Sequence, residues 1–441
     1  MHLTRFFILI GFCLGLPLVS LAQEQKAPLR LTLAEALNKV DTVNLQVMMA
    51  SARLEQAITR ISQAQSDLLP HFDGVVSGGR QTVDLRAEGI QFPGLGTHIG
   101  PYNTFDARLR VTIALFDPSA FERFQAAKKG ESLSEAQLEK TREDILALVA
   151  TLFVDAQRKQ QTFRLLQTLL EKDQKAYELS EDALAQGTGT LLDTNKLNSQ
   201  LEQTKFLYQQ AKLQAEDARL DLSAALQLPV NMPLLFLDDK DLLKALGSNA
   251  VINFNNTTNA DMAMASALLE ARKADQKIAY ADFLPKVSGT ADYGRSGGSP
   301  GHGSNTYFAG LQATVPLWEG GSQQSNVKEV KQKIKEAQEN FLDASQQEQV
   351  NTAKAIAAIA EADYLIEAKI QNRQTAQRSL LIAFQAQKTG SGTVLEVMRE
   401  KADLAIAEDQ YNEAQALWVM SHIDLLHAQG RLRMLVSRRG K

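Results

Sequence analysis

The sequence predicts a mainly α-helical fold with some β-structure, in which one structural unit occurs twice along the chain. Three observations support this fold class. Two stretches of about 65 residues are rich in helix-forming residues and nearly free of glycine and proline. Shorter segments alternate apolar and polar residues with a period of two, the pattern of strands with one apolar face. Short landmarks recur in the same order in both halves.

Three pairs of landmarks define the repeat. The members of each pair are separated by nearly half of the chain, and three matches in the same order are a far stronger signal than one. The paired segments are residues 66–74 and 281–289, residues 109–117 and 311–319, and residues 187–193 and 390–396. They predict a first repeat over residues 23–235, an inter-repeat link over 236–260 and a second repeat over 261–441.

The first 22 residues have the features of a secretory signal peptide. A charged start is followed by an apolar run from Phe6 to Val19, which is too short to cross a bilayer, and by the small-residue site Ser20-Leu21-Ala22. We therefore assign residues 1–22 to a cleaved signal peptide. The only cysteine, Cys13, lies inside it, so the predicted mature chain cannot form a disulfide. Lipidation at Cys13 is a minor alternative, because the preceding Phe12 is bulky where such sites carry a small residue.

Composition and charge narrow the classes of function. The net charge of −4 gives no basic face for nucleic acid, so no nucleic-acid partner is expected. The 44% of apolar and 22% of charged residues are ordinary for a structured chain. No later segment has the length and apolarity of a transmembrane helix, so an exported chain of this kind is soluble, lipid-anchored or part of a β-barrel.

Each repeat is expected to contain a helix, a β-hairpin and then a long helical hairpin. The β-hairpins are predicted at about 72–116 and about 286–317, and the helical hairpins at about 118–227 and about 320–435. Asp117 and Pro118 are typical of a helix start, with the aspartate as cap and the proline in the first turn. Because short glycine turns join the long helices to their return helices, the two helices of each hairpin should be antiparallel neighbours.

The long helices are predicted at residues 121–185 and 322–388. At 1.5 Å per residue each would be roughly 100 Å long, which no single globular core can enclose. Their apolar positions form a narrow seam suited to coiled-coil packing. In the first helix the seam is predicted at Ile145, Leu148, Val149, Leu152 and Phe153.

The predicted strands fit a membrane crossing. Strands of about 10 residues suit a tilted passage through an outer membrane, and their polar loops are expected at about 83–104 and about 294–305. An open sheet edge cannot persist in lipid, and four strands cannot close a barrel, for which about 8 is the minimum. The protein should therefore oligomerise. A dimer would supply eight strands with little lumen, and a trimer would supply twelve around a water-filled pore.

Over essentially the whole mature chain, this order of elements resembles the TolC family of outer-membrane efflux proteins. The resemblance rests on the repeated Leu-Pro-led hairpin, long helix, glycine turn and returning helix. It implies long antiparallel helical hairpins that form a trimeric α-barrel, and four strands per protomer in a shared 12-stranded transmembrane β-barrel. It also implies a homotrimer in the outer membrane with a large periplasmic part. Its partners would be a periplasmic adaptor and an inner-membrane pump, in a tripartite efflux or type I secretion system.

The resemblance also points to residues at the tips of the helical hairpins. The family places an acid six residues after a glycine, which matches Asp193 and Glu396 here. Three copies of such a carboxylate in a narrow lumen would repel anions and favour cations. A second acidic position falls on Arg399, which has the opposite sign, so an ion pair of Asp193 or Glu396 with Arg399 is a hypothesis. An equally weighted interpretation makes both acids ordinary helix-start residues. The expected tip turns and adaptor-docking residues are Gly187, Gly189, Thr190, Gly390, Gly392 and Thr393.

No arrangement typical of catalysis is found, so an enzyme is not expected, nor a cofactor or metal. His422 and His427 are five residues apart and have no obvious acidic partner. The glycine-rich segment 297–303 lacks the lysine of a phosphate loop and is expected to be an outer turn. The alternative to a channel is a soluble periplasmic coiled-coil scaffold or tether. The sequence does not indicate the exported cargo.

Overall fold

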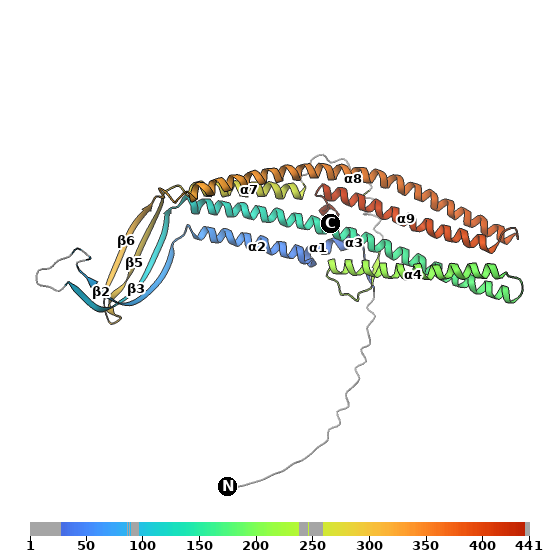
Figure 1. Ribbon diagram of the computed structural model, residues 1–441, viewed down its shortest axis with the longest axis horizontal. Helices are drawn as coiled ribbons and strands as arrows, with labels where there is room; N and C mark the ends of the chain where they lie inside the picture. Colours follow the sequence, from blue (N-terminus) through green and yellow to red (C-terminus); the bar gives the residue numbers. More distant parts are fainter. Residues whose placement is uncertain are drawn as a thin grey trace, which may run out of the picture.

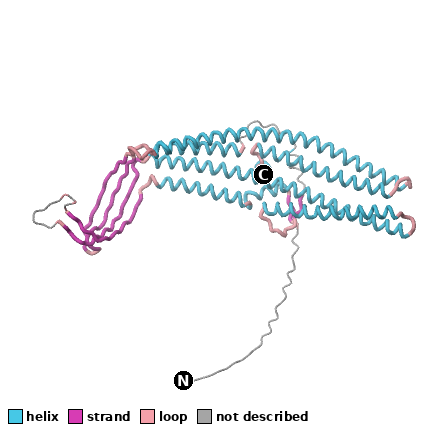
Figure 2. The backbone as a smooth tube through the Cα atoms, viewed as in Figure 1, coloured by secondary structure: helices cyan, strands magenta, loops and turns pink. Residues whose placement is uncertain are grey.

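The computed structural model describes residues 28–85, 97–237 and 259–436, together with the single positions 87, 89 and 246. The predicted signal peptide and most of the predicted link lie outside the described residues. The molecule is long and gently curved, with a β-sheet at one end and the tips of two helical hairpins at the other (Figures 1 and 2). Among the described residues, no helix combines the length and hydropathy needed to cross a membrane.

The two halves contain helices of nearly equal length in the same order. Helices α2 and α7 have 22 residues each, α3 and α8 have 68 and 67, and α4 and α9 have 35 each. The helices are α1 (Leu33–Val43), α2 (Leu45–Ser66), α3 (Pro118–Ala185), α4 (Leu191–Ala225), α7 (Ala260–Ala281), α8 (Ser322–Lys388), α9 (Val394–Ala428) and α10 (Arg433–Val436). The strands are β1 (Leu29–Leu31), β2 (His71–Asp84), β3 (His98–Phe116), β4 (Leu234–Phe236), β5 (Lys286–Ser299) and β6 (His302–Thr314).

Local chemistry explains where the long helices begin and end. The Asp117 carboxylate accepts a hydrogen bond from the Ala120 N–H at 3.0 Å, and Pro118 occupies the first turn of α3, as predicted. Helix α9 ends at Ala428, earlier than the predicted end near residue 435. The cause is Gly430, whose φ of +62° ends the helix while Arg431 N–H bonds back to the Leu426 carbonyl.

The sheet has four antiparallel strands in the order β2-β3-β5-β6, so the two repeats meet where β3 pairs with β5. The strands are 13 to 19 residues long, longer than predicted, and the loops are correspondingly shorter. Strand β5 continues to Ser299 and strand β6 begins at His302, because the polar and glycine residues of this segment still pair through their backbones. Strand β6 ends at Thr314, short of the predicted residue 317, just before Pro316, which has no N–H to donate.

The main hydrophobic core lies midway along the molecule. There the short parallel pair β1–β4 and helix α1 pack against α3 and the ends of α4 and α9. Phe153 is buried and meets the Phe236 ring edge-on, with 5.3 Å between ring centroids. Val149 of the predicted seam is also buried, but Leu148 is 47% exposed, because Leu146 and Ala150 occupy the buried side of α3 in its place.

Candidate functional site

One face of the sheet is apolar and exposed. Residues directly opposite each other in the ladder share a face, so Leu109, Tyr293 and Tyr307 lie side by side across β3, β5 and β6. Tyr307 is 83% exposed and Leu311 is 76% exposed. The face is built from Phe72, Val76, Phe105, Ala107, Leu109, Val111, Ile113, Tyr293, Tyr307, Ala309 and Leu311. An apolar surface of this extent requires a non-aqueous or protein neighbour.

The opposite face of the sheet is polar and charged. Asp73, Arg110 and Asp292 are direct neighbours on β2, β3 and β5. The Arg108 guanidinium donates to Asp106 at 2.6 Å and to Asp292 at 2.8 Å, across the pairing between the two repeats. Asp292 is only 8% exposed. Since breaking a covered ion pair leaves an uncompensated charge, this cluster ties the two β-hairpins together.

The helical tips turn on two glycines each. Gly187 and Gly390 have φ values of +74° and +75°, the left-handed region that residues with a Cβ avoid. The second glycine of each tip has no space for a side chain. A Cβ added to Gly189 would lie 2.9 Å from the Leu184 nitrogen, and a Cβ added to Gly392 would lie 2.9 Å from the Ala386 Cβ. Each tip therefore requires its first glycine for the backbone conformation and its second glycine for the lack of space.

The two candidate acids lie in the first turns of the return helices. Thr190 caps α4, accepting from the Asp193 N–H at 3.1 Å and donating its hydroxyl to the Asp193 carboxylate at 2.8 Å. Thr393 caps α9, and Glu396 accepts from the Thr393 N–H at 2.9 Å to complete a capping box. Within a single protomer, Asp193 and Glu396 are therefore helix-start residues. Among the described residues, Arg399 forms no ion pair with either acid.

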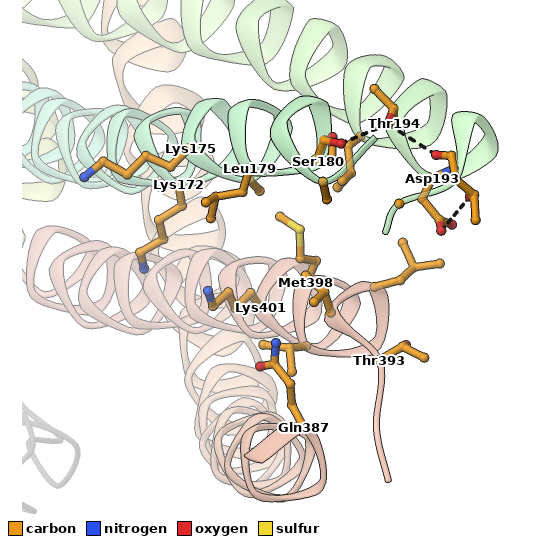
Figure 3. Close-up of a pocket in the computed structure, with 18 of the residues that line it drawn as sticks. Lys172, Lys175, Leu179, Ser180, Asp193, Thr194, Gln387, Thr393, Met398 and Lys401 are labelled. Atoms are coloured by element: carbon orange, nitrogen blue, oxygen red, sulfur yellow. Dashed lines mark hydrogen bonds between the residues drawn. The ribbon is translucent and has the colours of Figure 1, made fainter. Parts of the chain in front are cut away.

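A cavity of about 620 Å³ opens between the two helical hairpins near their tips, and the sequence did not predict it. Its walls come from both repeats, with Lys172 and Leu179 on α3 and Met398 and Lys401 on α9 (Figure 3). Asp193 lies at its tip end. No local signal could have revealed this site, because its walls are more than 200 residues apart in the sequence.

The prediction that His427 has no acidic partner was wrong. The His427 Nε2 lies 3.1 Å from the Asp144 carboxylate, across a separation of 283 residues. This hydrogen bond raises the pKa of His427, and burial opposes it only in part. Burial works against the charged form of Asp144, but His427 and Lys140 outweigh it and lower the Asp144 pKa. Lys140 also pairs with Asp261, so the network joins α3, α7 and α9.

Within the described part of the chain, no group of three or more His, Cys, Asp or Glu side chains could hold a metal ion.

The fold and its two-faced sheet define a class, the protomers of outer-membrane channels. The structure is similar to the CmeC outer membrane channel of Campylobacter jejuni, with a TM-score of 0.76 and 19% identity over 90% of this chain and 85% of that one. It is also similar to the outer membrane protein VceC of Vibrio cholerae, with a TM-score of 0.73 and 19% identity over 90% of this chain and 96% of that one.

The sequence profile described as "Outer membrane efflux protein" matches residues 36–227 and 256–431, well over half of the chain. The chain belongs to the outer membrane efflux protein family. Its function is accordingly that of an outer-membrane channel subunit, and not that of the periplasmic scaffold that the sequence left open.

Two relatives from Pseudomonas aeruginosa illustrate the range of the family. The alkaline protease secretion protein AprF is 22% identical over 355 residues, which are 75% of this chain and 69% of the relative. The pyoverdine export outer membrane protein OpmQ is 21% identical over 406 residues, which are 89% of this chain and 85% of the relative.

Proposed function

We propose that three copies of this chain form a passive exit duct across the outer membrane and the periplasm. The observation that carries the proposal is the sheet with one exposed apolar face, one charged face and two open edges. Strands β2 and β6 are the edge strands of the sheet. In lipid, their backbone N–H and C=O groups need partners, and a neighbouring protomer can supply them on both sides.

The number of strands favours a trimer. Four strands per protomer give eight in a dimer, the smallest practical barrel with a filled interior. A trimer gives twelve, which leaves room for a water-filled lumen. In this arrangement the Leu109 and Leu311 face meets lipid and the Arg108 and Asp292 face lines the duct.

The helical part gives the duct its length. At 1.5 Å per residue, α3 with its 68 residues is roughly 100 Å long, a length suited to crossing much of a periplasm. We infer that the hairpin tips meet a periplasmic adaptor and, through it, an inner-membrane pump. The names of relatives, which refer to alkaline protease secretion and pyoverdine export, support both a type I secretion role and an efflux role. A duct of this kind needs no catalytic chemistry of its own, and a cleaved signal peptide over residues 1–22 would deliver it to the envelope.

The mass of the assembled particle tests the proposal. The full chain is extracted from outer membranes in detergent and measured by light scattering with the detergent subtracted. A mass of three mature chains is expected, with the N-terminal residue at Gln23. A monomer that salt releases from the membrane would remove the basis for a shared barrel and overturn the duct.

We further propose that Asp193 and Glu396 form a negatively charged constriction in the trimer. Both side chains lie beside the tip turns, where three copies would approach the axis of a closed tube. Because each carboxylate is hydrogen-bonded to the threonine that caps its helix, Thr190 or Thr393, its position is fixed relative to the tip.

The Glu396→Gln variant tests the charge of the proposed constriction while keeping the capping box of α9. Glutamine also completes a capping box, so α9 should begin unchanged while three charges per trimer are lost. In planar bilayers we expect the reversal potential of the variant to shift toward lower cation preference. Asp193→Asn should shift it in the same direction. Glu329→Gln, on the exposed surface of α8, is the matched control. Unchanged selectivity in both tip variants would leave the acids with only their structural role in the first turns of α4 and α9.

A further inference from the structure

The cavity between the helical hairpins is a structural feature that the exit duct does not explain. Its position is set by the two hairpins, which are joined nearer the middle of the molecule by the hydrogen bond from the Thr162 hydroxyl to Asp409. Towards the tips, α3 and α9 enclose an open space of about 620 Å³. That volume lies within the range of sites for drug-sized molecules.

The lining of the cavity is amphipathic. Apolar side chains from both hairpins contribute to it, among them Leu179, Leu197, Phe384, Val397 and Met398, together with polar side chains such as Ser180, Gln387 and Thr393. Lys172, Lys175 and Lys401 lie at its end away from the tips (Figure 3). The cavity thus has a cationic end and an apolar body, the arrangement expected for a ligand with a charged head and an apolar remainder.

The positive charge at this end is only partly balanced. Lys172 and Lys401 extend from facing helices into the same space (Figure 3). Lys401 also lies over the Phe384 ring, 5.1 Å from its centroid. Among the described residues, none of the three lysines forms an ion pair within 4 Å.

Asp173 and Asp193, the acids closest to the cavity, do not remove this imbalance. Asp173 lies close to Lys172 and Lys401, but it is 3% exposed and turned towards α4, where it accepts the Thr204 hydroxyl at 2.7 Å. Asp193 is engaged by Thr190 at the opposite end. The ammonium groups of Lys172 and Lys401 therefore share this end of the cavity while one buried carboxylate stands behind them, and like charges that face each other favour an anion between them (Figure 3).

We propose that this cavity binds an amphipathic organic anion, with its acidic group between Lys172 and Lys401 and its apolar body along Leu179 and Met398. The site needs only the two hairpins of one chain, so it does not depend on the trimer or on conduction. Because the ligand would contact both α3 and α9, it would also hold the hairpins at a fixed separation and steady their tips.

Binding is tested with the full chain purified from outer membranes into lipid nanodiscs. Naphthalene-2-sulfonate is titrated by calorimetry, with empty nanodiscs as the baseline for partition into lipid. The double variant Lys172→Gln, Lys401→Gln should bind at least about tenfold more weakly, because two charge-assisted hydrogen bonds are lost. Leu179→Ser should also weaken binding, through the apolar body of the ligand. The matched control is Lys331→Gln, Lys335→Gln on the exposed surface of α8, outside the cavity.

The neutral analogue 2-naphthalenemethanol distinguishes charge recognition from general apolar binding. It should bind the wild-type chain more weakly than the sulfonate does and be insensitive to loss of the two lysines. Hydrogen exchange at residues 183–190 and 386–394 should slow when the sulfonate is bound. Equal sulfonate affinity in the wild type and in the Lys172→Gln, Lys401→Gln variant would overturn the proposal. Absence of binding to the wild type would also overturn it and leave the cavity to a protein partner, while the trimer mass would be unaffected in either case.

Discussion

At the scale of single residues, the two glycines of each helical tip are required for different structural reasons. Gly390 has a positive φ with open space around it, whereas Gly392 has no room for a Cβ. The sequence could predict a glycine turn from its repetition at Gly187 and Gly189. It could not assign the two roles, since one depends on φ and the other on how closely the backbone approaches Ala386.

Replacing Gly390 should loosen the tip without changing the rest of the helix. Gly390→Val forces a β-branched residue into the left-handed region, at a cost of about 1–2 kcal/mol, and Gly390→Asn should cost less. Hydrogen exchange of the Ser391 and Gly392 amides, which bond to the Ala386 carbonyl, should quicken roughly 5- to 30-fold in the valine variant. Gly130→Ala, inside α3 and with open space around it, is the control and should leave the tips unchanged. Similar exchange in the valine and asparagine variants would contradict the conformational explanation.

His427 should make stability depend on pH in a predictable direction. Its pKa is raised by Asp144, so the folded state binds the proton more tightly than the unfolded chain does. The stabilisation is complete below the ordinary histidine pKa of about 6.5 and is lost as the pH rises through the raised value. Because the side chain is 38% exposed, the effect should not exceed about 1 kcal/mol.

Thermal unfolding of the wild type and of His427→Gln measures this effect. The difference between the two should shrink as the pH rises from about 6 to about 9. Glu143, Asp261 and Asp424 are acidic neighbours of His427, so the His427→Gln variant is measured at each pH as the reference. A constant difference across the range would mean that the pair does not titrate there.

At the scale of elements, helix α3 is continuous over 68 residues but buries only a narrow side of its surface. The periodicity of its apolar residues predicted that seam, and the prediction was correct for Val149 and Phe153. It was wrong for Leu148, because periodicity alone cannot decide between neighbouring rows of a helix that packs against several partners.

Two leucines on α3 provide a matched test of that seam. Leu146 is 4% exposed and Leu148 is 47% exposed. Leu146→Ala should lower the free energy of unfolding by about 2–5 kcal/mol through the cavity it leaves, and Leu148→Ala by less than about 1 kcal/mol. Denaturant unfolding followed by helical circular dichroism measures both. Equal losses would indicate that Leu148 is covered by another protomer in the assembly.

At the scale of the whole molecule, the sheet and the helical hairpins lie at opposite ends and meet different environments. The exposed Tyr307 and Leu311 face would be unfavourable in water, and the Arg108 and Asp292 face would be unfavourable in lipid. The proposed position in the wall of a barrel would satisfy both faces at once.

Neighbouring residues on β6 test this orientation. Leu311 and Gln312 lie on opposite faces of the same strand. Leu311→Arg should cost about 2–4 kcal/mol if its side chain is near the middle of the bilayer, and should reduce the protein recovered in outer membranes. Gln312→Arg adds the same charge to the polar face and should be tolerated. Equal recovery of the two variants would contradict the assignment of the faces.

The sequence by itself determined the order and type of the long helices and the β-hairpins, and the approximate length of the helices, because these follow from local properties. Long runs without glycine or proline give the helices, alternation gives the strands, and caps such as Asp117 fix helix starts. The repetition of the two halves strengthened each of these predictions. Family resemblance, and not local pattern, supplied the trimer and the tip acids.

The tertiary structure alone decided which distant residues meet. Three features join residues from different repeats. They are the hydrogen bond between His427 and Asp144, the ion pair between Arg108 and Asp292, and the cavity between the helical hairpins. The extension of the strands beyond their predicted ends was also decided by pairing across the sheet. The physical reason is the same in each case. Such contacts depend on the angle and register at which whole elements pack, and a one-dimensional pattern does not contain that information.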